Sequence, residues 1–369
     1  MSWGRDLEAS IGRRGVAVAV AAVVAGTAAF LSGLGGGRSP GTYGTLIASW
    51  MFFAGGALGA VAFGALFRII PARWARALVA LGRAPVVFAP VALALLLVIL
   101  AGAETAPWVA GSRGWLAPPV LVAREIGLGT ALFGAAWLWF GPRSRSPAEV
   151  ALASAVTFLI GYTIVLSIWA FDFVLGPDPV FGSTVIGPFV FVSAFLAGAD
   201  LLVLLALARG EFSPSDRHDA VSLLLAVTVF WSYLFAAQFL TIWYGNLPDE
   251  TGFLLRRMQG GWGWSGLAML VLVFGAPFAA LLHPVGKSSP RALAAILVGQ
   301  LAGIWLLFQD LIVPSLTSGD SLLPIHPRAV LIALGVIGAF VLTVAPALRH
   351  AAAPPVAGEV AAPPERRTP

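Results

Sequence analysis

Ten long apolar runs follow one another along this chain of 369 residues, and they constrain the fold more than any other feature. A helix that crosses the hydrocarbon core of a bilayer needs about 20 mostly apolar residues. Backbone groups in lipid must be hydrogen-bonded within the protein, which leaves helices or a closed barrel. The runs are longer and more evenly apolar than barrel strands, so the sequence predicts an all-α polytopic membrane protein with about ten transmembrane helices. The predicted spans are residues 15–33, 45–68, 84–103, 117–140, 148–172, 182–208, 219–245, 261–282, 291–313 and 328–349.

The basic residues predict the orientation of these spans. Only 11% of the residues are charged, against about 25% in soluble domains. Of the 22 Lys and Arg residues, 16 lie in segments on the same side as the N-terminus, five lie on the opposite side, and Arg124 lies within a span. Cytoplasmic segments carry this excess of basic residues. Both termini are therefore predicted to be cytoplasmic, and the net charge of +5 needs no nucleic-acid ligand to explain it.

Two spans end in a similar pattern, which predicts an internal repeat. Residues 167–179 read SIWAFDFVLGPDP, and residues 303–315 read GIWLLFQDLIVPS. Each segment has a Trp, then an Asp and then a Pro, and the two spans are four apart and run in the same direction. Parallel repeats of this kind occur in some transporters. The alternative is a coincidence of residues that favour the membrane interface.

The repeat predicts two four-helix bundles within a single integral membrane domain of residues 1–350. Bundle one, spans 2–5, covers about residues 45–172, and bundle two, spans 6–9, covers about residues 182–313. The first and last spans are peripheral to the bundles. The Pro- and Ala-rich residues 351–369 predict a disordered cytoplasmic tail.

Span 2 carries small residues at nearly one-turn spacing. They are Gly55, Gly56, Gly59, Ala60 and Gly64. Small residues let helix backbones approach closely in lipid. We therefore expect this stripe to pack against another helix.

Few ionisable groups lie at membrane depth, and each of them is a candidate functional residue, because a charge there costs at least about 2.5–3.5 kcal/mol. They are Asp200 in span 6, the neighbours Arg124 and Glu125 in span 4, and Asp172 and Asp310 near the outer ends of spans 5 and 9. Two interpretations stay open. The groups line a hydrated proton path, or they are static: Arg124 forms a structural ion pair and Asp200 hydrogen-bonds a neighbouring helix.

A proton path gives the candidates an order in depth. From the cytoplasm outward the order is Asp200, Tyr233, Gln238, Glu125 and Asp172. The gaps are too long for direct transfer and would need water between the groups. In this hypothesis Asp200 takes up a proton from the inner side and passes it outward.

The residue types exclude most cofactors from this chain. There is no cysteine, and all four histidines lie at span ends or in loops. Iron–sulfur clusters and c-type haem need cysteine, and a buried b-type haem needs axial ligands at membrane depth. No His or carboxylate cluster has the spacing of metal ligands, and no Gly-rich phosphate loop is present. The sequence therefore predicts no metal, no cofactor and no catalytic residue.

Span 7 and the residues that follow it resemble the F subunit of alternative complex III. The stretch RHDAVSLLLAVTVFWSYLFAAQFLTIWYGNLPDET has the family's His-Asp at the start, its Phe-Trp-x-Tyr and Gln in the middle, and its Ile-Trp-Tyr-x-Asn-x-Pro-x-Glu-Thr at the end. The segments APFAALLHPVGKSS and DLIVPSL are also similar to the family, and Arg124 stands where the family has an Arg entering span 4. The resemblance covers about residues 45–315 and is strong in residues 218–315.

The loop between spans 5 and 6 departs from the family. The family has His-Trp where this chain has Val180 and Phe181, and Gly176 precedes Pro177 where Ser-Leu would stand. A role that needs that histidine is not carried over to this chain.

The resemblance implies a subunit of a respiratory quinol:electron-acceptor oxidoreductase in the bacterial inner membrane. Such a subunit binds no redox centre and is not catalytic alone. Its implied partners are other membrane subunits, periplasmic iron–sulfur and haem c subunits, and a terminal oxidase, with quinone nearby. Its implied part is scaffolding and proton transfer, and its outer turn would dock against periplasmic subunits. The residues of that turn are Asn246, Pro248, Glu250 and Thr251.

Two other functions remain as alternatives. The repeat and the buried acid Asp200 are also typical of a stand-alone secondary transporter. The chain could also be the quinol-binding membrane anchor of an iron–sulfur oxidoreductase.

Overall fold

A computed structural model describes residues 3–35, 39–102, 106, 108–141, 150–210, 213–283, 289–317 and 326–351. Within these residues, ten helices are long and apolar enough to cross a membrane, and the chain is an all-α polytopic membrane protein as predicted. Most of the predicted tail lies outside the described residues. The elements in chain order are α1 (Trp3–Ser32), α2 (Ser39–Ile69), α3 (Arg76–Leu81), η1 (Pro85–Phe88), α4 (Ala89–Ala101), η3 (Gly114–Leu116), α5 (Pro118–Phe140), α6 (Leu152–Ala170), η5 (Phe171–Leu175), α7 (Ile186–Arg209), α8 (Pro214–Gly245), α9 (Pro248–Met258), α10 (Gly260–Leu270), η6 (Val271–Gly275), α11 (Ala276–Leu282), α13 (Pro290–Ile312), η7 (Val313–Ser315) and α14 (Pro327–Leu348).

The eight central spans form two bundles that meet through α2 and α7. In bundle one, α2 packs against α4, α5 and α6, and α5 packs against α4 and α6. In bundle two, α7 packs against α8 and α13, while α10 and α11 pack against α13. Between the bundles, α6 packs on α7 in the same way that α13 packs on α2. This reciprocal set of contacts is the one that a parallel repeat of four helices produces.

The seam between α2 and α7 is close because both helices present small residues there. A Cβ atom on Gly59 would lie 2.2 Å from the carbonyl oxygen of Ala194, and one on Gly198 would lie 2.3 Å from the backbone nitrogen of Ala60. The predicted small stripe of span 2 therefore does pack against another helix. Van der Waals contact between backbones is a main source of helix association in lipid.

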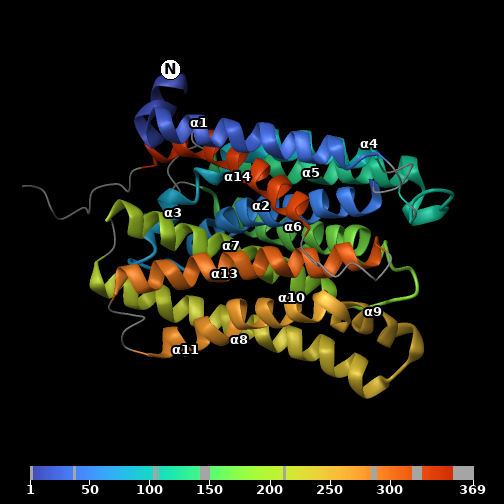
Figure 1. The fold of residues 1–369 in the computed structure, drawn as a ribbon. Helices are drawn as coiled ribbons and strands as arrows, with labels where there is room; N and C mark the ends of the chain where they lie inside the picture. Colours follow the sequence, from blue (N-terminus) through green and yellow to red (C-terminus); the bar gives the residue numbers. More distant parts are fainter. Residues whose placement is uncertain are drawn as a thin grey trace, which may run out of the picture.

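The first and last spans pair with each other at one edge of the molecule (Figure 1). Helix α14 also packs on α2 and η1, whereas α1 makes most of its contacts with α14. A Cβ on Gly26 would lie 2.6 Å from Gly335 Cα, so this pair again meets through glycines. Helices α8 and α11 lie along the opposite edge (Figure 1).

Local sequence explains where two of the spans begin. Ser213 precedes Pro214 at the start of α8, and Ser289 precedes Pro290 at the start of α13. Each serine hydroxyl accepts a hydrogen bond from a backbone N–H three residues later, at 3.1 Å and 3.3 Å. Serine is a favoured N-cap, and proline suits the first helical position because it has no N–H to leave unpaired.

The span Gly260–Leu282 is interrupted by the π-helical turn η6 and by Pro277 just after it. Proline has no N–H, so the carbonyl four residues earlier, that of Val273, loses its helical partner. The Nε2 of Gln300 on α13 donates to this carbonyl at 2.8 Å. The carbonyl that the proline leaves without a helical partner therefore accepts a hydrogen bond from the neighbouring helix.

Candidate functional site

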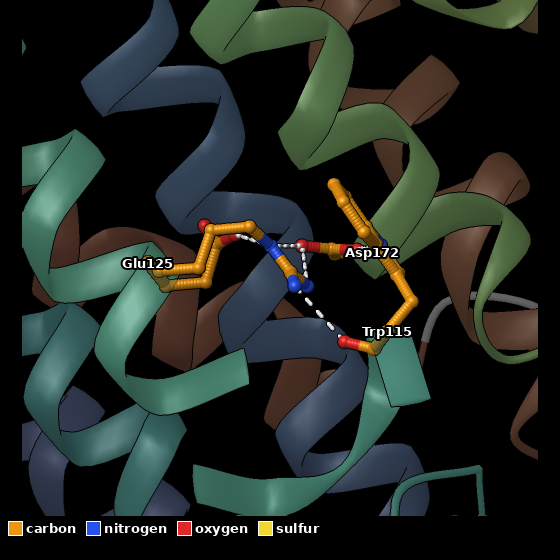
Figure 2. Close-up of polar contacts among 4 residues, drawn as sticks. Trp115, Glu125 and Asp172 are labelled. Carbon is orange, nitrogen blue, oxygen red and sulfur yellow. Dashed lines mark hydrogen bonds and ion pairs between the residues drawn. The ribbon is translucent and has the colours of Figure 1, made fainter. Parts of the chain in front are cut away.

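The outer end of bundle one holds an ion pair in its interior, where outer denotes the side predicted to face away from the cytoplasm. Arg124 on α5 donates to Asp172 Oδ2 from Nε at 3.0 Å and from Nη2 at 2.6 Å (Figure 2). The Asp172 side chain has no exposed surface and that of Arg124 is 12% exposed. The two residues stand 48 positions apart, so the pair joins α5 to η5, the turn that follows α6.

Trp115, on the short turn η3, forms hydrogen bonds with both members of this ion pair. Its Nε1 donates to the second carboxylate oxygen of Asp172 at 2.7 Å, and its carbonyl accepts from Arg124 Nη1 at 2.9 Å (Figure 2). The guanidinium carbon of Arg124 also lies 3.9 Å from the Trp115 ring centroid. Sequence reasoning missed this residue. Its position just before the Pro-Pro start of α5, on the outer side, was the signal that could have found it.

Glu125 adds a second acid to the same cluster. Its side chain is fully buried, its Oε1 lies 3.5 Å from Arg124 Nε, and neither of its oxygens makes a hydrogen bond. If both acids were ionised, one guanidinium would face two carboxylates in the protein interior. Since an uncompensated buried charge is costly, the cluster is electrically neutral when the two acids hold one proton between them.

The outer end of bundle two has a corresponding acid with a different set of contacts. Asp310 on α13 is buried, and its Oδ1 accepts from the hydroxyl of Ser265 on α10 at 2.7 Å. The cation near it is Arg257, which comes from α9 outside the spans. Arg257 donates to the carbonyl of Leu311 at 2.6 Å and to Ser315 Oγ at 2.9 Å. Burial lowers the pKa of Arg257 to about 9, and the nearby Asp178 and Asp310 oppose this shift.

The loop between spans 5 and 6 contacts α9 through an ion pair and a pair of stacked rings. Asp178 forms an ion pair with Arg256. The ring of Phe181 stacks on that of Phe253, with 3.8 Å between their centroids. Loop and helix α9 therefore connect the two bundles on the outer side.

Asp200 lies apart from these outer groups, in α7. Its side chain is fully buried, and neither carboxyl oxygen has a hydrogen-bond partner. No ion pair joins it to any of the described residues. The hydrogen bond to a neighbouring helix that the static interpretation expects is not formed.

Tyr233 and Gln238 do not join Asp200 in one interior path. Tyr233 is 63% exposed, on the face of α8 that points away from the bundle, and its ring stacks on that of Phe230 with 6.2 Å between the centroids. The Oε1 of Gln238 accepts from the hydroxyl of Ser183 in the loop between spans 5 and 6. Of the five residues in the predicted order, the structure brings only Glu125 and Asp172 into one cluster.

The residues of the predicted outer turn connect α8 to α9. Asn246 ends α8 in the left-handed region with φ 47°, a conformation that asparagine tolerates at a helix C-terminus. Pro248 starts α9, Glu250 lies in its first turn, and the Thr251 hydroxyl donates to the Pro248 carbonyl at 3.3 Å. Most of the turn is exposed.

No group of three or more His, Cys, Asp or Glu residues within the described part of the chain is arranged to hold a metal ion. Comparison with protein-family models and with curated proteins finds no match to this chain.

Proposed function

We propose that this chain is a non-redox membrane subunit of a respiratory quinol:electron-acceptor oxidoreductase of the alternative complex III type. It spans the bacterial inner membrane with both termini in the cytoplasm. It serves as a scaffold and takes part in proton transfer, while partner subunits carry haem c and iron–sulfur clusters. The proposal unites the resemblance of residues 218–315 with one feature of the surface of α8.

That feature is a stripe of side chains on α8, all exposed except the half-buried Ala237, which we name the α8 stripe. Its members are separated alternately by four and three residues, the spacing by which one helix packs along another. Phe230, Tyr233, Leu240 and Tyr244 are 50%, 63%, 56% and 85% exposed. The α8 stripe consists of Ala226, Phe230, Tyr233, Ala237, Leu240 and Tyr244.

The hydroxyl of Tyr233 makes the α8 stripe unsuited to lipid alone. Tyr233 stands 12 residues before the end of α8, which is about 18 Å along the helix axis. Tyrosine in membrane proteins is concentrated at the interface, where its hydroxyl reaches water. An exposed tyrosine this deep favours a transmembrane helix of another subunit, which buries the ring and hydrogen-bonds the hydroxyl. This observation carries the proposal.

The outer side of the chain fits the docking of subunits outside the membrane. The exposed turn from Asn246 to Thr251 directly follows the α8 stripe. A partner that covers the stripe therefore also meets this turn. The ion pair of Asp178 with Arg256 and the stacked rings of Phe181 and Phe253 hold the neighbouring loop and α9 together.

The cluster of Arg124, Glu125 and Asp172 supports the part in proton transfer. Two buried carboxyls beside one guanidinium hold one proton when they are electrically neutral. The cluster lies at the outer end of bundle one, the side to which a quinol oxidoreductase releases protons. No redox step in this chain is required for this role.

A second candidate is a stand-alone secondary transporter. The reciprocal packing of the two bundles and the unpartnered acid Asp200 favour it, because transporters combine repeats with buried ionisable groups.

Purification from the native membrane in a mild detergent separates the two candidates. A tagged chain is expected to co-migrate with haem c and iron–sulfur polypeptides, detected by their optical spectra and by mass spectrometry. A chain that purifies alone and moves a solute into liposomes would overturn the proposal and support the transporter.

A further inference from the structure

Bundle two contains a buried carboxyl whose two oxygens have no partner, which the outer clusters do not explain. Asp200 is fully buried, and both Oδ1 and Oδ2 lack a hydrogen bond. A buried polar group without a hydrogen bond costs free energy, and an unpaired buried carboxylate costs much more. A residue of this kind inside a membrane span is a functional candidate by default.

Helix geometry places Asp200 toward the interior of bundle two. It follows Ser193 by seven residues, and seven residues are close to two full helical turns, so both side chains leave the same face of α7. Ser193 Oγ accepts a hydrogen bond from Trp231 Nε1 on α8 at 2.8 Å. The face that carries Asp200 therefore points toward α8, away from the glycine seam with α2.

Gln300 on α13 offers a matching unpartnered acceptor in the same interior. Its Nε2 donates to Thr228 Oγ1 at 3.0 Å and to the Val273 carbonyl at 2.8 Å. Both donor hydrogens are thereby used, and the side-chain oxygen of Gln300 has no partner. Residues of three helices hold this amide in place, but no group donates a hydrogen bond to its oxygen.

The two groups lie at similar depths on helices that pack against each other. Asp200 lies about 10.5 Å inward of Ser193 along α7, at 1.5 Å per residue. Thr228, the neighbour of Gln300, lies three residues or about 4.5 Å inward of Trp231 along the antiparallel helix α8. Because Ser193 and Trp231 are hydrogen-bonded, Asp200 is about 6 Å, one helical turn, inward of Thr228 and Gln300. An axial offset of one turn is one that two long polar side chains, or two side chains and one water, can bridge between packed helices.

The charged groups on the elements around α7 leave Asp200 without a counter-ion. No ionisable residue on the helices that pack against α7 forms an ion pair with Asp200 in the described part of the chain. The buried Tyr162 uses its hydroxyl to donate to the Phe191 carbonyl at 2.8 Å. Asp310 is hydrogen-bonded at the outer end of α13. These elements are α2, α3, α6, α8 and α13, and their ionisable residues are Tyr43, Arg68, Arg76, Tyr162, Asp216, Arg217, His218, Asp219, Tyr233, Tyr244, Arg291 and Asp310.

We propose that Asp200 is a reversible proton-binding site in bundle two, and that its protonated carboxyl donates its O–H to the side-chain oxygen of Gln300. The proton comes from the aqueous phase on the inner side, about 13 Å away along the nine residues to Arg209, and returns there on release. The carboxyl O–H donates the hydrogen bond that the Gln300 oxygen otherwise lacks. Protonation also makes the carboxyl neutral, so no uncompensated charge remains in the interior. This site is separate from the outer cluster of bundle one, and it does not depend on assembly with other subunits.

Infrared spectroscopy of the purified full-length chain in lipid nanodiscs tests this proposal. At neutral pH the wild type is expected to show the C=O stretch of a protonated carboxyl that shifts in D₂O. Asp200→Asn is expected to remove the intensity of one carboxyl group per chain from this band. Asp219→Asn, an exposed acid at the start of α8, is the matched control and is expected to leave the band unchanged.

Gln300→Met tests the hydrogen bond while it leaves the carboxyl in place. Loss of the acceptor is expected to move the carboxyl band to higher frequency, and this readout remains if Asp200→Asn does not fold. A band that is unchanged in either variant would overturn the proposal. A carboxylate signal at Asp200 that changes on addition of sodium chloride, with no protonated band, would also overturn it and indicate a cation site.

Discussion

The outer ends of the two bundles place an aspartate at corresponding positions and neutralise it in different ways. In bundle one, Asp172 in η5, just after α6, forms an ion pair with Arg124 of α5, a residue of the same bundle. In bundle two, Asp310 at the end of α13 accepts a serine hydroxyl, and the nearby Arg257 comes from α9 and binds backbone carbonyls. The two acids occupy corresponding positions at the ends of their spans, but the source of their compensation differs.

The difference indicates that Arg124 stabilises bundle one, whereas Arg257 holds the outer elements in place for docking. The Arg124 pair lies inside bundle one and is covered by Trp115, so its contribution is to the fold and the proton content of that bundle. Arg257 donates hydrogen bonds to Phe253 of α9, to Leu311 at the end of α13 and to Ser315 of η7. Its contribution is to the outer surface, where we propose that partner subunits bind.

Arg124→Met is expected to cause the largest loss of stability, and this loss is specific to bundle one. It leaves Asp172 and Glu125 buried without a cation, and removal of one member of a buried ion pair costs about 3–5 kcal/mol. The measurement is the free energy of unfolding in mixed detergent and SDS micelles. Arg113→Met, at an exposed position in an outer loop, is the control and is expected to change stability by less than about 0.5 kcal/mol. An Arg124→Met protein as stable as the control would show that the cluster contributes nothing to the fold.

Asp172→Asn is expected to destabilise the protein more than Asp310→Asn does. The first change weakens hydrogen bonds to a charged donor, which are worth about 1.5–3 kcal/mol, whereas the second leaves an amide oxygen that still accepts from Ser265 and costs about 1 kcal/mol. The same unfolding measurement applies to both. Equal losses would mean that the two aspartates are compensated in the same way after all.

Gly59→Ala is expected to affect both bundles, because the seam belongs to neither alone. The added Cβ would meet the Ala194 carbonyl at 2.2 Å, and overpacking of this kind costs about 1–3 kcal/mol. Gly134→Ala on α5, where nothing lies within 4 Å of the new Cβ, is the matched control. It is expected to be neutral or to stabilise by up to about 1 kcal/mol, since alanine favours helix. A Gly59→Ala protein with unchanged stability would contradict the close packing of the seam.

The sequence predicted the spans and the seam because both are local patterns. Hydropathy located all ten spans, although α2 begins at Ser39 and α8 at Pro214, several residues before the apolar runs. Helices continue past the lipid boundary until a cap or a proline stops them, and hydropathy does not record this. The small stripe of span 2 was likewise readable, because glycine spacing on one helix is enough to indicate close packing.

The contacts of the candidate site could not be predicted, because they join residues far apart in the chain. Asp172 meets Arg124 across 48 positions, and Gln238 meets Ser183 across 55. Periodicity did not tell which face of α8 is buried, so Tyr233 was placed in an interior path although its side chain lies on the exposed surface. The resemblance to a respiratory subunit stays a prediction.

Helices α4 and α8 occupy corresponding places in the two bundles, since α4 packs on α2 and α8 packs on α7. The smallest effect on the isolated chain is expected from a change that tests the difference between their exposed surfaces. The exposed side chains of α4 include Leu97 and Val98, which suit lipid, whereas α8 exposes Tyr233. Tyr233→Phe keeps the ring and removes only the hydroxyl, so the stability of the purified chain should stay within about 0.5 kcal/mol of wild type. In the native membrane the same change is expected to reduce co-purification of partner subunits several-fold, because a buried hydrogen bond to the partner helix is lost. Leu97→Ala on α4 is the control, and it should leave co-purification unchanged. Equal recovery of partners with Tyr233→Phe and with wild type would show that the hydroxyl faces lipid and that the α8 stripe is not the assembly surface.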